Sequence, residues 1–196
     1  MRELLMIGVF GLDEEYVKDI TRTAGDACEV FHARSADDVE RRLGETEIMF
    51  GYRLTDDLLA SAGRLKWVQA TGAGVDWALT DAFVSSDIVL TNVSGIHAVQ
   101  MSEHAVGMMI ALARNFPFYI LEQRKKVWNR ALGLLEGTEL ARKTLGILGL
   151  GAIGEALAVR AKAFDMRVLG VKRSPLGYRG VADEAMGAAA MERVFR

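Results

Sequence analysis

The chain has 196 residues, of which 51% are hydrophobic and 26% are charged, and its formal net charge is −2. This ordinary globular composition leaves ample core for one or two domains, and the near-neutral charge argues against a nucleic-acid partner held by phosphate neutralisation. Cys28 is the only cysteine, so an internal disulfide is excluded and a cytoplasmic location is expected.

Neither a targeting segment nor a membrane span is expected. The first ten residues, MRELLMIGVF, are too short for a signal peptide and lack a small-residue cleavage site. The longest apolar run in the middle of the chain, Ala105–Ala113, falls far short of the roughly 20 residues that a spanning helix needs. We therefore expect a soluble protein without a membrane partner.

Strand-like runs alternate with helical patterns through the first half of the chain. This alternation is typical of an α/β fold with a parallel sheet and helices on both faces. Ser35 suits the N-cap of the second helix. The predicted strands are Leu4–Phe10, Glu29–His32, Glu47–Phe50, Lys66–Gln69 and Ile88–Leu90, and the predicted helices are Asp13–Thr23, Ser35–Leu43 and Asp56–Ala62.

A long helical pattern runs from Ala98 to Lys126. Its first part is apolar on nearly all sides, which predicts a buried helix. Pro117 should end or kink it, because proline lacks a backbone N–H and clashes with the preceding turn. Residues Trp128–Arg142 are predicted to form an irregular connection.

A glycine motif stands at the centre of the second half. Gly149, Gly151 and Gly154 form G-x-G-x-x-G directly after the apolar run Leu145–Leu148. A helix follows, with one face predicted to carry four apolar side chains, and Arg167–Val171 reads as the next strand. The four side chains are Ile153, Leu157, Ala161 and Phe164.

Strand, glycine turn, helix and strand in this order are the context of a dinucleotide-binding fingerprint. Gly149 permits the tight turn, Gly151 lets the backbone approach a pyrophosphate, and Gly154 lets helix and strand pack closely. The helix beginning near Ala152 directs unpaired N–H groups and a partial positive charge at the phosphates. A purely structural glycine turn is the alternative.

The end of the second strand bears on the choice of cofactor. NAD sites carry Asp or Glu about 20 residues past the glycines, whereas a nearby Arg suits the 2′-phosphate of NADP. This chain has Lys172, Arg173 and Ser174 there, without a carboxylate. We predict NADP(H) as the preferred cofactor and NAD(H) as the less favoured one, with a solvated basic turn as the alternative.

The loop Ala70–Asp76, ATGAGVD, follows the strand Lys66–Gln69. Ligands of open parallel sheets bind beyond the carboxyl ends of strands, and small residues expose the N–H groups that form an anion nest. A substrate carboxylate is therefore expected there, with a tight turn into a helix at Asp76 as the alternative.

A second loop, Thr91–Glu103, precedes the long helix. Asn92, Ser94 and Ser102 are predicted to be turn or cap residues. His97 and His104 are more readily explained as structural hydrogen bonders than as catalysts. No metal site is predicted, because no set of ligands of the required number is present.

Four segments in order along the chain carry a family resemblance: KWVQATGAGVD (66–76), TNVSGIHAVQMSEHAVGMMIALAR (91–114), VWNR (127–130) and KTLGILGLGAIG (143–154). Together they resemble the D-isomer-specific 2-hydroxyacid dehydrogenases, most closely the branch of glyoxylate/hydroxypyruvate reductases and related 2-ketoacid reductases. The resemblance implies reduction of small 2-ketoacids with NAD(P)H, and a homodimer in the intact protein.

The resemblance also implies a domain plan. A flavodoxin-like, doubly wound substrate-side domain would span residues 1–98. The first βαβ portion of a Rossmann domain would span residues 99–196, including the linking helix 98–126, and the active site would lie between the domains.

Several site residues follow from the resemblance alone. Ala73, Gly74 and Val75 would hold the substrate carboxylate, and Met101 would contact the nicotinamide. Arg53 is a candidate for the pocket of the substrate side chain. The predicted cofactor residues are Met101, Gly149, Gly151, Ala152, Ile153, Gly154, Lys172, Arg173 and Ser174.

The family's catalytic arginine, glutamate and histidine are expected later in the nucleotide domain than Arg196, where this sequence stops. No catalytic residue is therefore assigned, and this chain alone is expected to be inactive, poorly stable or associated through an unpaired sheet edge. A non-enzymatic dinucleotide-binding module, such as an NAD-sensing corepressor, is one alternative. A formate dehydrogenase is another, although ATGAGVD and the basic turn argue against it.

Overall fold

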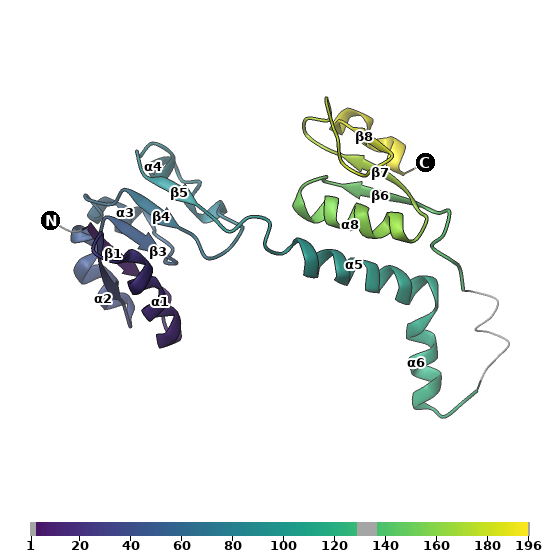
Figure 1. Cartoon of the computed structure of the whole chain (residues 1–196), viewed down its shortest axis with the longest axis horizontal. Helices are drawn as coiled ribbons and strands as arrows, with labels where there is room; N and C mark the ends of the chain where they lie inside the picture. Colours follow the sequence, from purple (N-terminus) through teal and green to yellow (C-terminus); the bar gives the residue numbers. More distant parts are fainter. Residues whose placement is uncertain (1–2, 129–136, 196) are drawn as a thin grey trace. The chain divides into compact units, whose positions relative to one another are not determined.

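The computed structural model describes residues 3–128 and 137–195. The chain divides into two compact units, Met1–Ser94 and Gly95–Arg196 (Figure 1). Each unit has its own parallel sheet and its own buried cluster of apolar side chains. The α/β class predicted from the alternating pattern is thereby confirmed.

The first unit is built on a five-stranded parallel sheet with the strand order β2-β1-β3-β4-β5. All five predicted strands are present, with ends that differ from the predicted ones by at most three residues. The strands are β1 (Glu3–Ile7), β2 (Cys28–His32), β3 (Ile48–Phe50), β4 (Trp67–Gln69) and β5 (Val89–Thr91).

Helices and short helical turns connect these strands. The three predicted helices are present, and the four-residue α4 was not predicted, because it is shorter than the window in which helical periodicity can be seen. The elements are α1 (Glu14–Ala24), α2 (Ala36–Arg42), η1 (Leu43–Glu45), α3 (Asp56–Ser61), η2 (Asp76–Ala78) and α4 (Asp81–Val84).

Short polar side chains fix where these helices begin. Ser35 accepts a hydrogen bond from the N–H of Asp38, and Thr55 and Thr80 cap α3 and α4 in the same way. Each cap satisfies one of the N–H groups that the first turn of a helix leaves without a partner. The predicted N-cap at Ser35 is confirmed.

The second unit contains a three-stranded parallel sheet with the order β6-β7-β8. The third strand was not predicted from the sequence, since Glu184–Met186 begins with a charged residue and does not form an apolar run. The elements are α5 (Ala98–Ala113), α6 (Phe116–Arg124), β6 (Thr144–Leu148), α8 (Ala152–Ala163), β7 (Arg167–Val171), β8 (Glu184–Met186) and η3 (Ala188–Val194).

Helix α8 lies between the sheet of this unit and α5 (Figure 1). Its sheet-facing residues are small: Gly154, Ala158 and Ala161 are the buried ones. The predicted apolar face does not coincide with these buried residues, because Ile153 and Phe164 are 43% and 37% exposed. Close approach of helix to strand selects small side chains there and displaces the larger ones.

The helical pattern predicted from Ala98 to Lys126, with an end or kink at Pro117, forms two helices, α5 and α6. The break lies at Asn115, whose φ of 55° is in the left-handed region. Pro117 stands in the first turn of α6, where its missing N–H is harmless. The predicted interruption at Pro117 is therefore present, and the proline stands at the start of the second helix.

The prediction that the long helix is buried was wrong among the described residues. Only Ser102 and Ala113 of α5 are buried, while Met101, Met108 and Leu112 are 49%, 52% and 71% exposed. The helix packs along one side against α8. A helix that is apolar on all sides is expected to be covered on all sides, whereas the outer face of α5 is exposed among the described residues.

The predicted irregular connection 128–142 is described only in part, because residues 129–136 lie outside the described residues. Asn129 and Arg130 of the VWNR segment fall in that range. The described part, residues 137–142, contains neither helix nor strand. Within residues 3–128 and 137–195, no helix is both long and apolar enough to cross a bilayer.

Candidate functional site

The glycine turn joins β6 to α8 in the second unit. Gly149 has a φ of 114°, which favours glycine. The N–H groups of Gly149 and Leu150 both donate to the carbonyl of Val171, each at 3.0 Å. The turn is therefore held against the end of the neighbouring strand β7.

Gly154 is required by close packing. A Cβ atom at this position would lie 2.1 Å from the carbonyl oxygen of Gly149, which is a severe overlap with backbone. Helix α8 thus crosses directly over the turn. This is the packing role predicted for the third glycine of the motif.

Gly151, in contrast to the closely packed Gly154, lies next to open space. It is the N-cap of α8, and a Cβ atom added there would meet no atom within 4 Å. The first backbone N–H that donates to a carbonyl of this turn is that of Glu155, to Gly151, so the amides of Ala152 and Ile153 precede the helical ladder. Open space, unpaired N–H groups and the positive helix end therefore coincide at one place.

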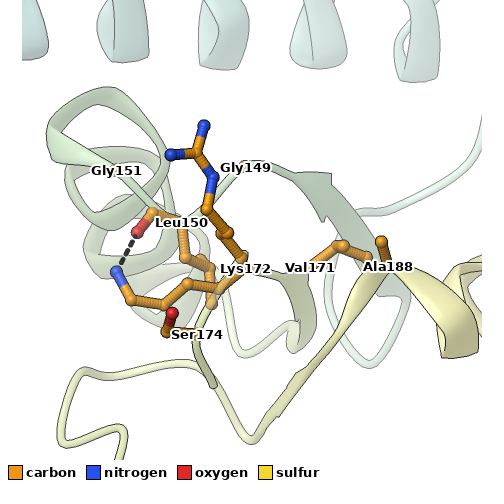
Figure 2. A pocket seen from close by; sticks show the side chains of 8 residues that line it. Gly149, Leu150, Gly151, Val171, Lys172, Ser174 and Ala188 are labelled. Carbon is orange, nitrogen blue, oxygen red and sulfur yellow. Dashed lines mark hydrogen bonds between the residues drawn. The ribbon is translucent and has the colours of Figure 1, made fainter. Parts of the chain in front are cut away.

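An open pocket of about 640 Å³ lies beside this turn (Figure 2). Its size is in the range of small-molecule sites. Three segments form its wall: the turn itself, the end of β7 with the basic residues after it, and the start of η3. The lining residues are Gly149, Leu150, Gly151, Val171, Lys172, Arg173, Ser174 and Ala188.

The pocket brings together five of the predicted cofactor residues: Gly149, Gly151, Lys172, Arg173 and Ser174. Ala152, Ile153 and Gly154 follow directly in α8. Met101 lies on α5, half exposed, and is not among the lining residues.

Three lining residues were missed by sequence reasoning: Leu150, Val171 and Ala188. Leu150 and Val171 belong to the glycine motif and to the predicted strand, so their positions carried a signal. Ala188 carried none, because it reaches the pocket only through the third strand, which the sequence did not reveal.

The basic residues after β7 differ in their partners. The ammonium of Lys172 donates to the carbonyl of Leu150 at 2.9 Å, as the dashed line in Figure 2 shows. Arg173 and Ser174 are exposed. The pocket therefore offers a guanidinium and a hydroxyl to a ligand, and its lining contains no carboxylate.

These features fit the diphosphate of a dinucleotide. The open space beside Gly151 would be occupied by a side chain at any residue other than glycine. It lies at the N-terminus of the twelve-residue helix α8. The cationic wall adds charge of the complementary sign. Anionic ligands are thus favoured by geometry and by electrostatics.

Two groups that connect α8 with the chain beyond β7 have shifted pKa values. Burial raises the pKa of the Tyr178 hydroxyl, which donates to Glu155 at 3.0 Å. Hydrogen bonds from the Lys162 ammonium and from the N–H of Val168 hold the pKa of Asp183 below its ordinary value. These contacts fasten the segment that carries the pocket's basic wall and Ala188.

The predicted carboxylate loop lies in the first unit, after β4. Ala73 and Gly74 are exposed, and Val75 directly precedes the short helical turn η2. The side-chain amide of Asn92 donates to the carbonyl of Ala73 at 2.7 Å, which ties this loop to the loop after β5. The loop therefore has a defined conformation and exposed backbone at the carboxyl end of its strand.

The two histidines beside α5 have ordinary surroundings. His97 is the N-cap residue of α5, with its Nδ1 3.0 Å from the side-chain amide of Gln100, and His104 is exposed on the helix. Ser102, predicted as a cap or turn residue, is inside α5 and donates to the carbonyl of Ala98. In the part of the chain that the structure describes, no three potential metal-ligand side chains cluster.

The second unit matches a known protein family. Residues 106–196 match the model described as D-isomer specific 2-hydroxyacid dehydrogenase, NAD binding domain. A D-3-phosphoglycerate dehydrogenase of Methanocaldococcus jannaschii is 35% identical over 120 residues, which cover 61% of this chain and 22% of that protein. One from Archaeoglobus fulgidus is 30% identical over 161 residues, 81% of this chain and 30% of that protein.

Solved structures agree over a longer span. A D-isomer specific 2-hydroxyacid dehydrogenase family protein of Aeromonas salmonicida has a TM-score of 0.82 and 32% identity, covering 98% of this chain and 60% of that one. An NADPH-dependent glyoxylate/hydroxypyruvate reductase of Sinorhizobium meliloti, in complex with NADP, has a TM-score of 0.74 and 25% identity, covering 98% and 59%. The chain thus spans less than two thirds of the length of these relatives.

Proposed function

Because residues 106–196 match the NAD-binding domain of the D-isomer specific 2-hydroxyacid dehydrogenases and a solved structure of that family resembles 98% of this chain, we propose that the chain belongs to this family and serves an oxidoreductase acting on small 2-hydroxyacids. The proposed reaction is reduction of the corresponding 2-ketoacids with NAD(P)H in the cytoplasm, for which this chain supplies cofactor- and substrate-binding residues but no assigned catalytic residue. The bound cofactor supplies the hydride, while the residues of this chain bind and orient cofactor and substrate.

One observation carries the cofactor proposal. The space over Gly151 is empty to 4 Å, beside the unpaired amides that begin α8. Backbone can approach a pyrophosphate closely only where no side chain intervenes. The adjoining wall of Arg173 and Ser174 offers hydrogen bonds and positive charge to the 2′-phosphate of NADP, and NAD lacks that group. NADP(H) is therefore the preferred cofactor.

The substrate carboxylate binds to the backbone of Ala73, Gly74 and Val75 in the first unit, and Met101 contacts the nicotinamide. Support comes from the exposed backbone of the loop after β4 and from its tie to Asn92. Glyoxylate and hydroxypyruvate are the proposed substrates, as in the Sinorhizobium meliloti reductase. D-3-phosphoglycerate is the competing candidate, since several relatives are dehydrogenases of that compound.

The first experiment titrates the full chain with NADPH and NADH, following nicotinamide fluorescence and the thermal midpoint. We expect tighter binding of NADPH, because Arg173 and Ser174 can bind its 2′-phosphate. A ligand that binds only the folded state raises the midpoint, and at equal concentration the tighter ligand raises it more. Turnover of glyoxylate, hydroxypyruvate and D-3-phosphoglycerate is then compared by nicotinamide absorbance. Absence of binding by both cofactors would refute the proposal.

The matched variants are Gly151→Ala and Gly107→Ala. At Gly151 the backbone φ of −97° accepts alanine and no atom is near, so the fold should be unaffected. The new methyl group occupies the pyrophosphate space, and we expect both cofactors to bind at least about tenfold more weakly, or 1.4 kcal/mol. At Gly107, also in open space, alanine should leave binding unchanged.

A further inference from the structure

The ammonium of Lys172 is bound to the glycine turn. Its Nζ atom lies 2.9 Å from the carbonyl oxygen of Leu150, in a partly buried contact. A hydrogen bond from a charged donor is shorter and stronger than one between neutral groups. In the described part of the chain, Lys172 has no carboxylate partner that would compete for its charge.

The acceptor residue is held on its other sides too. The side chain of Leu150 is 2% exposed and lies over Gly170, where an added Cβ atom would come within 2.2 Å of it. Its N–H donates to the carbonyl of Val171. The carbonyl of Leu150 is therefore the group of this residue whose direction depends on Lys172.

The donor residue is anchored by the third strand. The backbone N–H of Lys172 donates to the carbonyl of Met186 in β8 at 2.8 Å. Strand β8 thus fixes the place from which the lysine side chain reaches back to the turn. The contact links β8, β7 and the glycine turn through one side chain.

The consequence for the turn follows from peptide geometry. A peptide unit is planar and trans, so the N–H of Gly151 points opposite to the carbonyl of Leu150. Among the described residues this N–H has no hydrogen-bond acceptor. Holding the Leu150 carbonyl toward Lys172 therefore holds the Gly151 N–H away from it, in one fixed direction.

We propose that Lys172 is a positioning residue that pre-orients the Leu150–Gly151 peptide for the cofactor diphosphate. This inference rests on the proposed dinucleotide site. It gives Lys172 a different role from that of Arg173 and Ser174. Lys172 stabilises the turn, which NADPH and NADH use alike, because both carry the same diphosphate. Arg173 and Ser174 read the 2′-phosphate, which only NADPH carries.

The test compares Lys172→Met, Lys172→Arg and Arg173→Ala in the full chain, with Lys143→Met as the matched control. Lys143 is an exposed lysine of the same unit that precedes β6. Dissociation constants are measured for NADPH and for NADH by nicotinamide fluorescence. Amide hydrogen exchange of residues 149–151 is measured without cofactor.

Lys172→Met should weaken both cofactors by a similar factor, about tenfold, and leave the ratio of the two dissociation constants within about threefold of wild type. It should also speed amide exchange in the turn. Lys172→Arg, which keeps a charged donor, should restore most of the affinity. Arg173→Ala should weaken NADPH alone, and Lys143→Met should change neither.

Other outcomes are decisive as well. Loss of NADPH affinity alone in Lys172→Met would show that the lysine reads the 2′-phosphate, and unchanged affinity for both cofactors would show that the contact has no role. If Lys172→Met fails to fold, the Lys172→Arg variant decides. Wild-type amide exchange in the turn and wild-type affinity for both cofactors would support the positioning role of Lys172. A changed ratio of the NADPH and NADH dissociation constants would oppose it. A wild-type chain that binds neither cofactor refutes the proposed function instead.

Discussion

Single residues around the glycine turn have distinct tasks, which substitutions can separate. The carbonyl oxygen of Gly149 stands 2.1 Å from the position of a Cβ atom on Gly154. We predict that Gly154→Ala destabilises the second unit by about 1–3 kcal/mol, because the overlap is with backbone and cannot be relieved by a rotamer change. Urea unfolding measures the change.

Gly107→Ala again provides the control for that substitution. It lies in α5 with no atom near its added Cβ, and helix propensity predicts stabilisation of up to about 1 kcal/mol. Equal stability of the Gly154→Ala variant and wild type would mean that helix and turn can separate without cost.

A second residue-scale prediction concerns acid stability. The pKa of Asp183 is held below its ordinary value by hydrogen bonds from Lys162 and the N–H of Val168. Because the folded-state pKa is depressed, its contribution is complete above the ordinary aspartate pKa of about 3.9 and is lost as the pH falls below it. Asp183→Asn should therefore destabilise the chain at pH 7 more than at pH 3.

That prediction is checked by urea unfolding of both proteins across this pH range. The two stability curves should converge as the pH falls. A constant difference between the curves would show that the carboxylate gains nothing from its charge.

At the scale of elements, the break between α5 and α6 depends on one backbone conformation. Asn115 has a φ of 55°, and its side-chain amide nitrogen is buried without a hydrogen-bond partner among the described residues. We predict that Asn115→Gly is tolerated or stabilising, whereas Asn115→Ala costs about 1–2 kcal/mol. Thermal melts of the two variants should differ in this order.

The distance between α8 and its neighbours determines which of its residues are buried more than its apolar periodicity does. The pattern of α8 placed Ile153 and Phe164 on one apolar face, yet the buried residues of the helix are Gly154, Ala158 and Ala161. A large side chain is favoured in a core only if the neighbouring element leaves room for it. Sequence alone did not contain the distance between α8 and the turn.

At the scale of the whole molecule, the exposed apolar side chains of α5 support a homodimer. Met108 and Leu112 are four residues apart, on one side of the helix, and 52% and 71% exposed. Contiguous exposed apolar surface marks interaction sites in soluble proteins. We predict that wild type is dimeric at micromolar concentration, and that the double substitution Met108→Glu, Leu112→Glu yields monomers.

Light scattering coupled to size-exclusion chromatography measures the mass of each protein. Lys143→Glu, at an exposed position outside these helices, should leave the mass unchanged. A monomeric wild type, or a dimer that survives the double substitution, would contradict the prediction.

The sequence by itself determined the parallel α/β class, the strands of the first sheet and the glycine turn between β6 and α8. These features depend on local signals: apolar runs, N-cap residues such as Ser35, and glycines at a fixed spacing. Each can be recognised because the physical cause lies within a few residues of the effect.

Only the tertiary structure decided which residues share the pocket and what Lys172 contacts. Strand β8 holds Lys172 in place through Met186, and η3 brings Ala188 to the wall. Both depend on a three-residue strand whose stability comes from its neighbour β7 and not from its own pattern. The sequence did not reveal this strand, because Glu184–Met186 begins with a charged residue and forms no apolar run, so only its pairing with β7 identifies it.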